Sequence, residues 1–545
     1  MTKNIFGEKA FINGKIITMN NDFIAQALAI RGNRISAVGD SESIKKLVNG
    51  NAEIIDLEGK VVIPGLIESH CHAASAGTEL LNEVNLHNAR NINDILGIIK
   101  NKTVSIEPGK WIKGIGYNEN NLEERRHLNK WELDKVSPNN PVFIQRIDYH
   151  QGIANSLALD MANINKNTFL DLKNGRIYRE EYSAEPNGLL AEAAQGLVKD
   201  LIPSYSISDL KKGIIHACEI LSKWGITSFS DAAVEHDPFV AYQELYLENK
   251  LPLRVGLIIE GFDALGFKGF FEEMKSLGLI TNFGNDYLRI IGVKIFTDGS
   301  LSGGTAALYQ PYNNNPNNFG VMNSEGEVLN RQIKDIYNAG LRPIIHAIGD
   351  RAIDEAINGI EETLSNTQDN NHRIRIEHCN LTHRDALEKI IKNKLIVSSS
   401  ITHLYELGNS HSEALGYERT KNYFRLKTLL KKGAIIVGNS DWPITCGNPF
   451  LGIHTAVNRK DIDGNTINVK ESISVEEALK LYTLNAAYAS FDENNKGSLK
   501  PGKYADLVII DRDIYNIPKE EIKDIQVLST MVNGNFVYQK RGILI

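Results

Sequence analysis

The sequence predicts an α/β fold: a (β/α)8 TIM-like barrel with a small composite β-sandwich built from both chain ends. Eight short apolar runs alternate with helical stretches through the middle of the chain, which is typical of repeated βα units around a parallel sheet. The two ends instead carry short β-prone runs separated by turn residues. A chain of 545 residues is long enough for one large barrel with additions.

The N-terminal segment reads as strands joined by tight turns. Its runs KAFINGKIITM and ALAIRGNRISAVG contain Asn13-Gly14 and Gly32-Asn33, which suit hairpins. The C-terminal segment is similar, with YADLVIID followed by VLSTMVNGNFVYQ and its Asn533-Gly534 pair. We therefore expect residues 1–62 and 491–545 to form the two parts of one β-sandwich, flanking a barrel over residues 63–490.

The barrel strands are predicted from short apolar runs that end in polar residues. They are residues 65–70, 225–231, 253–260, 288–296, 342–347, 373–378, 394–400 and 433–441. Between them, residues 206–223 show apolar side chains at helical spacing. Further helix starts are predicted from capping-box pairs, which are Ser324 with Glu327, Thr382 with Asp385, and Ser474 with Glu477.

One interval is too long for a single βα unit. About 150 residues separate the first predicted strand from the second, whereas one helix with its loops needs far fewer. The interval contains the strand-like run PVFIQRIDY and the turn-rich run KNGRIYREEYSAEPNG. We expect an inserted subdomain at about 80–200 that covers the barrel mouth and shapes a substrate pocket.

Composition restricts the partners of this chain. The 60 Lys and Arg residues against 67 Asp and Glu give a formal charge of -7, and no dense basic run suggests nucleic acid.

No apolar window is long enough to span a membrane, and the start lacks a secretory pattern, so we expect a cytoplasmic protein. The expected partner is a small molecule, and a homodimer is the default assembly for such barrels. The four scattered cysteines argue against disulfides and thiolate zinc sites.

Polar residues gather at the predicted ends of the barrel strands, where such barrels carry their chemistry. Because residues i and i+2 of a strand point to the same face, His70 and His72 can direct both imidazoles at one ion. Neutral imidazoles with a carboxylate suit Zn²⁺, and an incomplete set of protein ligands leaves room for water. The residues concerned are His70, His72, Lys294, His346, His378 and Asp441.

Five motifs in this order resemble those of the amidohydrolase superfamily, specifically its YtcJ-like branch, which includes N-substituted formamide deformylases. The opening INGKIITM and the tail GSLKPGKYADLVIID resemble the composite β-sandwich of that family, so the resemblance covers nearly the whole chain. The five motifs are VIPGLIESHCH, GVKIFTDGSLSGGTAAL, IIHAIGDRA, RIEH and GNSDWP.

The resemblance implies a metal-bearing barrel hydrolase in which Asp441 matches the catalytic aspartate. Two departures stand out: Glu68 occupies a position where the family usually has Asp, and the run from Ser400 to His403 replaces the usual Gln-Pro-x-His. Neither removes a metal ligand, but the second alters a wall that faces the substrate, so no particular substrate carries over. The positions that match the metal-binding histidines are His70, His72, His346 and His378.

Lys294 matches the lysine that commonly becomes carboxylated in this superfamily. A neutral amine can react with CO2 to give a carbamate, an anionic bridge between two metals, whereas an ammonium beside a divalent cation is repelled. We therefore expect one or two Zn²⁺ per chain and a CO2-derived carbamate on Lys294. The alternative is a plain amine that pairs with Asp298 or binds a substrate carboxylate at a one-metal site.

The predicted activity is hydrolysis of a non-peptide C–N bond, in an N-substituted amide or formamide, by metal-bound hydroxide. Asp441 serves as general base and then general acid, and His378 or a metal polarises the carbonyl oxygen. Two alternatives stay open. One is a deaminase of a cyclic amine, although HAIGD lacks the Glu that such sites typically have near the fifth-strand histidine. The other is a non-catalytic binding protein that retains the barrel.

Further predictions concern contact with the substrate. The run QRIDYH lies in the predicted insertion, and two residues follow Lys294 closely, so both segments are expected near the pocket. The strand-seven run ends in a further histidine. The predicted substrate-binding residues are Arg146, His150, Asp298, Ser300 and His403.

Overall fold

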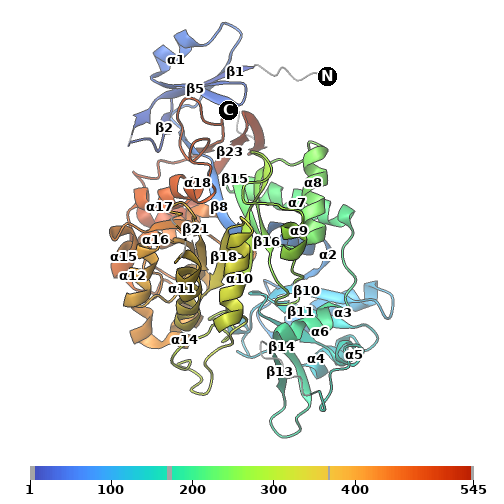
Figure 1. The fold of residues 1–545 in the computed structure, drawn as a ribbon. Helices are drawn as coiled ribbons and strands as arrows, with labels where there is room; N and C mark the ends of the chain where they lie inside the picture. The colour runs from blue at the N-terminus through green and yellow to red at the C-terminus, as the bar shows by residue number, and fades with distance from the viewer. Residues whose placement is uncertain (1–6, 22, 169–174, 366, 368, 542–545) are drawn as a thin grey trace.

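The computed structural model describes residues 7–21, 23–168, 175–365, 367 and 369–541. Residues 1–6 and 542–545, at the outer ends of the predicted sandwich segments, and residues 173–174 of the turn-rich run lie outside this part. Four sheets are present in it, and one of them forms the centre of the molecule (Figure 1).

The central sheet contains eight parallel strands and follows the chain order from the first to the last. The amide of Asp441 donates to the carbonyl of His70 (3.1 Å), so the two edge strands approach each other and the sheet is a nearly closed barrel. Every strand lies within three residues of its predicted position, because each is a buried apolar run. The strands are β8 (Leu66–Cys71), β15 (Ile226–Val234), β16 (Arg254–Glu260), β17 (Leu288–Phe296), β18 (Pro343–Ala347), β19 (Arg375–His378), β20 (Ile396–Ser400) and β21 (Ile435–Asn439).

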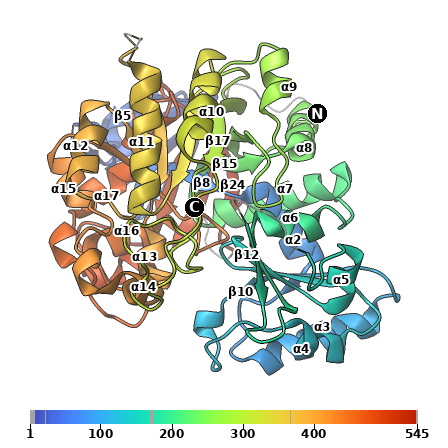
Figure 2. The same cartoon turned by 60° about the horizontal axis from the view of Figure 1, so that its bottom comes forward.

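Helices surround the barrel (Figures 1 and 2). The predicted helix at 206–223 is confirmed, because α7 (Ile207–Lys223) begins after Ser206, whose side chain accepts a hydrogen bond from the amide of Asp209. Its buried face carries the apolar residues that the helical spacing predicted. Other helices of this layer are α2 (Ala73–Asn82), α8 (His236–Leu247), α10 (Gly326–Asn338), α11 (Asp350–Leu364), α12 (Arg384–Lys392), α16 (Pro449–Asn458) and α17 (Val475–Leu481).

One of the three capping boxes is confirmed and two are wrong. Ser474 and Glu477 form the reciprocal pair at the start of α17. Helix α10 instead has Glu325 as its N-cap, and the hydroxyl of Ser324 donates to Gln332 (2.6 Å). Helix α12 begins one residue later than expected, because the ring of His383 accepts the hydrogen bond from the amide of Ala386.

Strands from both ends of the chain combine in one six-stranded sheet. In it, β7 (Val61–Pro64) pairs antiparallel with β22 (Leu507–Ile510), and the remaining members are β2 (Lys15–Ile17), β3 (Ile24–Ala25), β23 (Val527–Val532) and β24 (Asn535–Gln539). A four-stranded sheet shares an apolar core with it. That sheet contains β1 (Glu8–Ile12), β4 (Ala27–Arg31), β5 (Arg34–Gly39) and β6 (Glu53–Asp56).

The long interval between β8 and β15 carries its own six-stranded sheet, drawn in cyan to green beside the barrel in Figures 1 and 2. Helices α3 (Ile92–Ser105), α4 (Lys130–Val136) and α5 (Ser156–Met161) accompany it, and it has a separate apolar core. Its strands are β9 (Val84–Asn85), β10 (Ile112–Tyr117), β11 (Val142–Arg146), β12 (Gln151–Ala154), β13 (Gly175–Arg179) and β14 (Pro186–Glu192).

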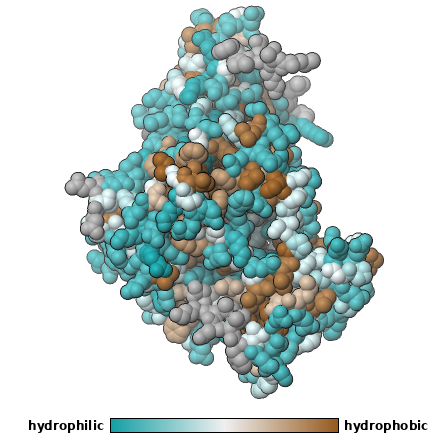
Figure 3. All heavy atoms as spheres, turned by 45° about the vertical axis from the view of Figure 1, so that its right-hand side comes forward, coloured by the Kyte–Doolittle hydropathy of each residue, from teal (hydrophilic) through white to brown (hydrophobic). Residues whose placement is uncertain are grey.

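The face shown in Figure 3 is mostly hydrophilic, with several separate hydrophobic clusters. Among the described residues, no helix is both long enough and apolar enough to cross a membrane.

Candidate metal centre

The carboxyl ends of five barrel strands bring the predicted ligands together. The ring centroids of His70 and His72 lie 5.4 Å apart, and those of His70 and His378 lie 5.2 Å apart. His346 lies against His378, with 4.6 Å between their ring centroids. One ligand atom each from His70, His378 and Asp441 lies within 4.8 Å of the others. These imidazoles and this carboxylate therefore face one small volume.

Asp441 lies at the centre of this group. Its Oδ1 is 3.4 Å from Nε2 of His70 and 3.3 Å from Nε2 of His72, and its Oδ2 is 3.4 Å from Nε2 of His403. Although burial raises it, the pKa of Asp441 is held well below its ordinary value, chiefly by His378 and His403. The buried Oδ1 nevertheless accepts no hydrogen bond within the described part of the chain. A bound cation would satisfy a buried carboxylate oxygen in that state.

Hydrogen bonds on the far side of each ring orient the first two histidines. Nδ1–H of His70 donates to Oε2 of Glu377 (2.5 Å), and Nδ1–H of His72 donates to the carbonyl of Ala232 (3.1 Å). Both rings therefore present the lone pair of Nε2 toward Asp441. This is the usual way in which a protein fixes the tautomer of a metal-binding histidine.

The other two histidines are oriented in the same manner. The hydroxyl of Ser400 donates to Asn439 (2.6 Å), so it accepts from Nδ1–H of His378 (2.8 Å) and leaves Nε2 unprotonated. His346 uses its other nitrogen, because Nε2–H donates to the carbonyl of Gly299 (3.2 Å) and Nδ1 keeps the lone pair. Burial lowers the pKa of both rings well below the ordinary value, which favours the neutral form that binds metals.

Glu377 is a residue of the site that the sequence analysis missed. It is fully buried and forms two contacts of 2.8 Å with Arg375. Burial alone would raise its pKa, but the Arg375 guanidinium and His70 hold that pKa well below the ordinary value. The carboxylate is therefore a fixed acceptor for His70. Its position directly before His378, inside a buried strand, is the signal that could have found it.

Lys294 reaches the same volume from β17. Its side chain is buried, and Nζ lies 3.1 Å from Nε2 of His70. The amine forms no ion pair with any carboxylate of the described residues within 4.0 Å, so the predicted pairing with Asp298 is not present. Burial is the main reason why the pKa of Lys294 is lowered. The lysine thus stands among the ligands as an amine without a counter-ion.

The predicted substrate residues occupy different surroundings. His150 lines the cavity at the centre, and its Nδ1 faces the carboxylate of Glu192 at 3.0 Å. His403 contacts Asp441, as described above. Asp298 lies behind His346, with Oδ1 3.5 Å from Nε2 of that ring, and its carboxylate accepts hydrogen bonds from the backbone amides of Ala307, Ile348 and Gly349 at 2.8 to 3.0 Å.

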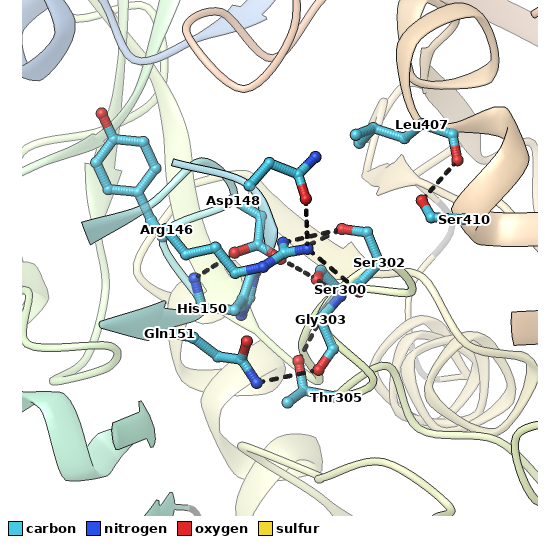
Figure 4. A network of polar contacts seen from close by, with 12 residues as sticks. Arg146, Asp148, His150, Gln151, Ser300, Ser302, Gly303, Thr305, Leu407 and Ser410 are labelled. Carbon is cyan, nitrogen blue, oxygen red and sulfur yellow. Dashed lines mark hydrogen bonds and ion pairs between the residues drawn. The ribbon is translucent and has the colours of Figure 1, made fainter. Parts of the chain in front are cut away.

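Arg146 and Ser300 belong to an internal network beside the centre (Figure 4). The buried guanidinium of Arg146 pairs with Glu119 (2.7 Å) and with Asp148 (2.5 Å). The hydroxyl of Ser300 donates to the same Asp148. These contacts occupy Arg146 with protein carboxylates, so its role in the structure is to hold the loop between β11 and β12.

Tyr149, on that loop, is a second residue that the sequence analysis missed. It lines the central cavity, its ring centroid lies 6.5 Å from that of His72, and its hydroxyl donates to Glu79 on α2. Its neighbours Arg146 and His150 were singled out, but an isolated tyrosine in a polar run gives no signal of its own.

The donor set fits a divalent metal. Neutral imidazoles with oriented lone pairs and one buried carboxylate without a hydrogen-bonded partner match the ligand preferences of zinc and similar ions. This group lies at the carboxyl ends of the strands of a parallel barrel, which is the face where the active sites of such barrels lie. The fold and the site are therefore those of a metal-dependent barrel enzyme.

Comparison with known proteins identifies the family. The sequence profile of the Amidohydrolase family matches residues 53–538, so the chain belongs to that family. The relatives include Protein LONG AFTER FAR-RED 3 of Arabidopsis thaliana, which is 31% identical over 96% of this chain and 91% of its own length. YtcJ of Bacillus subtilis (strain 168) is 29% identical over 94% of this chain and 96% of its own.

Two further comparisons bear on activity and fold. The N-substituted formamide deformylase of Arthrobacter pascens is 27% identical over 97% of this chain and 98% of its own. Among solved structures, a metal-dependent hydrolase from Pyrococcus horikoshii OT3 aligns with a TM-score of 0.76 and 30% identity. That alignment covers 94% of this chain and 99% of the other. The resemblance predicted from the motifs, to the YtcJ-like branch with its deformylases, is confirmed.

Proposed function

We propose that the protein is a metal-dependent hydrolase of non-peptide C–N bonds, acting on an N-substituted amide or formamide. The observation that carries the proposal is Oδ1 of Asp441, which is buried, accepts no hydrogen bond from the described residues and faces two oriented imidazoles. A carboxylate in this position can exchange a proton with a small molecule at the metal centre.

The ligands proposed for the metal are the four histidines with Asp441 and Lys294. A bound Zn²⁺ would polarise a carbonyl group and bring the pKa of a coordinated water from about 15.7 toward 7. His70, His72, His346 and His378 keep their lone pairs available because their other ring nitrogens are hydrogen-bonded.

Asp441 carries the proton transfers in this proposal. Its low pKa keeps it ionised, so it can accept the proton of the attacking water and return it to the departing nitrogen. His378 lies beside it, with Nδ1 3.9 Å from Oδ2 of Asp441, and would act on the carbonyl oxygen through the metal that its Nε2 would hold. The histidines and Lys294 exclude other water from the buried centre.

We further propose that Lys294 is carboxylated and that two ions bind. The neutral amine attacks CO2, a C–N bond forms, and the amine proton leaves to solvent, which gives an anionic carbamate. The support is geometric: Nζ is buried beside His70 and lacks a counter-ion within the described residues, so a cationic form would be unstable there.

The substrate class is supported by one relative, whose name states that it acts on N-substituted formamides. The test measures metal content and then turnover of N-formyl, N-acyl and carbamoyl compounds by the metal-loaded protein. Release of amine and acid from an N-formyl or N-acyl compound is the expected result. Ammonia release from cyclic amines alone would instead identify a deaminase, and binding without turnover would identify a non-catalytic protein.

A further inference from the structure

A second cavity, which we call the side cavity, lies beside the metal centre. Leu265 and Phe296 line both this cavity and the central one, so they form the wall between the two. The side cavity is bounded by the end of β16, the loop that follows it, the end of β17, and helix α10 with the residues before it. Its volume of about 60 Å³ exceeds the ~10 to 15 Å³ that one water molecule needs.

Glu260, the last residue of β16, is the buried acid of the side cavity. It is 1% exposed, and it lines the side cavity but not the central one. Its Oε2 is buried and accepts no hydrogen bond from the described part of the chain. A buried polar atom in that state commonly marks the place of a water molecule or an ion. The side cavity is the space from which such a partner can reach Oε2.

The charges around Glu260 do not neutralise it. Lys294 is its cross-strand neighbour on β17, but Nζ of that lysine lies 3.1 Å from Nε2 of His70 and forms no ion pair within the described residues. Burial raises the pKa of Glu260 well above its ordinary value, the charge of Lys294 opposes this, and the charge of Glu235 adds to it. A cation in the side cavity would stabilise the ionised carboxylate.

The other polar groups that line the side cavity offer oxygen atoms. The hydroxyl of Ser324 donates its proton to Oε1 of Gln332 (2.6 Å), so the Ser324 oxygen keeps its lone pairs for a ligand. Asp263 lines the exposed end, where it accepts a hydrogen bond from the amide of Gly269 (2.9 Å). Carboxylate, amide and hydroxyl oxygens are the ligands that hard cations prefer.

The charge of these ligands suits a monovalent ion. Oδ2 of Asp263 lies 3.6 Å from Nζ of Lys268, so this carboxylate already faces a cation. Glu260 is then the one carboxylate of the lining that no cationic side chain of the described residues approaches within 4.0 Å. One negative charge balances one positive charge, whereas a divalent ion would leave an uncompensated charge in a buried place.

From these contacts we infer that the side cavity binds a monovalent cation, Na⁺ or K⁺, through Glu260 with the oxygens of Ser324 and Gln332. None of these residues belongs to the metal centre, and the inference does not depend on the proposed hydrolase activity. The ion joins the end of β16 to α10 behind Phe296, whose ring centroid lies 4.7 Å from Nζ of Lys294. It therefore supports the wall of the central cavity.

The first experiment measures thermal unfolding of the full-length, zinc-loaded protein in KCl, NaCl and choline chloride at equal ionic strength. An ion that binds the folded state alone stabilises it by mass action, so Tm should be ~1 to 4 °C higher in one of the alkali salts than in choline chloride. Glu260→Gln keeps the shape of the side chain but removes its charge, and should abolish the difference. Glu388→Gln, in a surface pair with Lys432, is the matched control and should retain it.

The second experiment locates the ion. Crystals of the zinc-loaded protein grown with RbCl should show an anomalous peak in the side cavity, at coordination distance from Oε2 of Glu260. The peak should be absent from crystals of Glu260→Gln.

A third measurement changes the charge of the ligands. Gln332→Glu adds a second carboxylate and should shift the preference to a divalent ion, because ligand charge tunes the affinity for such ions. Ca²⁺ should then raise the Tm of this variant more than K⁺ does, whereas the wild-type protein should show the opposite order.

Two results would overturn the cation site. One is density for water alone in the side cavity, without anomalous signal, or an equal Tm in the three salts. The other is an alkali-dependent Tm that Glu260→Gln retains, since the ion would then bind elsewhere. Neither readout requires turnover, so a failure of this inference leaves the proposed hydrolase function intact, and a protein inactive on every amide can still bind the ion.

Discussion

Each histidine of the centre is oriented by the atom that its far ring nitrogen contacts. A carboxylate, two backbone carbonyls and a serine hydroxyl perform this role for the four rings. The candidate ligands can be read from the sequence, since they follow short apolar runs. Their tautomers cannot, because the partners come from other strands and loops.

Asp441→Asn tests the proton transfer. The amide keeps the shape of the carboxylate but cannot accept and return a proton, so kcat should fall by about 10²- to 10⁴-fold. Metal content, measured on the purified variant, should remain close to that of the wild type because the histidines still bind. Near-normal turnover by the metal-loaded variant would remove Asp441 from the mechanism.

Lys294 tests the carbamate bridge. If the amine carries CO2, two ions bind per chain, and reconstitution of the apo-protein improves when bicarbonate is added. Lys294→Ala should lose one ion and most activity, whereas Lys294→Glu should recover part of both because it presents a carboxylate nearby. One ion per chain in protein prepared with excess zinc and bicarbonate, together with density that ends at a bare amine, would exclude the bridge.

Glu377→Gln tests the positioning of His70. Replacing the carboxylate weakens the acceptor for Nδ1–H, and the metal dissociation constant should rise about 10- to 100-fold. Metal titration monitored by calorimetry measures the change. Glu388→Gln is the control, since that glutamate pairs with Lys432 at the surface, with a side chain 55% exposed. An unchanged metal affinity of the Glu377 variant would show that His70 is oriented by other contacts.

At the scale of helices and strands, the position of His72 depends on how α2 packs against its neighbours. His72 lies directly before α2, and the helix packs against α7 at a point where Gly77 meets Gly213. A Cβ on Gly77 would lie 2.0 Å from the carbonyl oxygen of Gly213, so the two backbones can approach this closely only without side chains. Small residues at this crossing therefore set the distance between α2 and α7.

Gly77→Ala should force α2 and α7 apart. Overpacking of this kind costs about 1 to 3 kcal/mol of unfolding free energy, and the shift should also weaken metal binding because His72 moves with α2. Thermal unfolding and metal titration measure the two effects. The control is Gly97→Ala on α3, where a new Cβ meets no atom within 4 Å. Equal stability of the two variants would contradict the role assigned to the crossing.

At the scale of the whole molecule, the order and the positions of the barrel strands could be predicted from the sequence. The barrel strands are buried apolar runs, and their polar ends placed the four histidines, Lys294 and Asp441 at one rim. The two wrong capping boxes have local causes, because the hydroxyl of Ser324 donates to Gln332 and the ring of His383 caps α12. The full lining of the central cavity could not be predicted, because Ser75, Tyr149 and Phe267 come from separate segments that only the tertiary structure brings together.

The barrel and the sheets at the chain ends are joined by a buried ion pair. Arg254, the first residue of β16, contacts Asp506 through Nε (2.7 Å) and Nη2 (3.2 Å), and both side chains are 3% exposed. The guanidinium also lies 4.0 Å from the ring centroid of Tyr504. The pair is at the amino end of its strand, whereas the metal centre is at the carboxyl ends.

Arg254→Met should therefore destabilise the protein without changing the chemistry. It leaves the Asp506 carboxylate buried and unpaired, which costs about 3 to 5 kcal/mol of unfolding free energy. The double variant Arg254→Met/Asp506→Leu removes both charges and should regain most of this loss. Lys46→Met, in a pair whose side chains are 79% and 82% exposed, is the control and should cost less than about 1 kcal/mol. Denaturant unfolding measures these values, and kcat well below the transition should match that of the wild type. A double variant as unstable as the single one would show that the contacts with Tyr504, rather than the charges, join the two parts of the molecule.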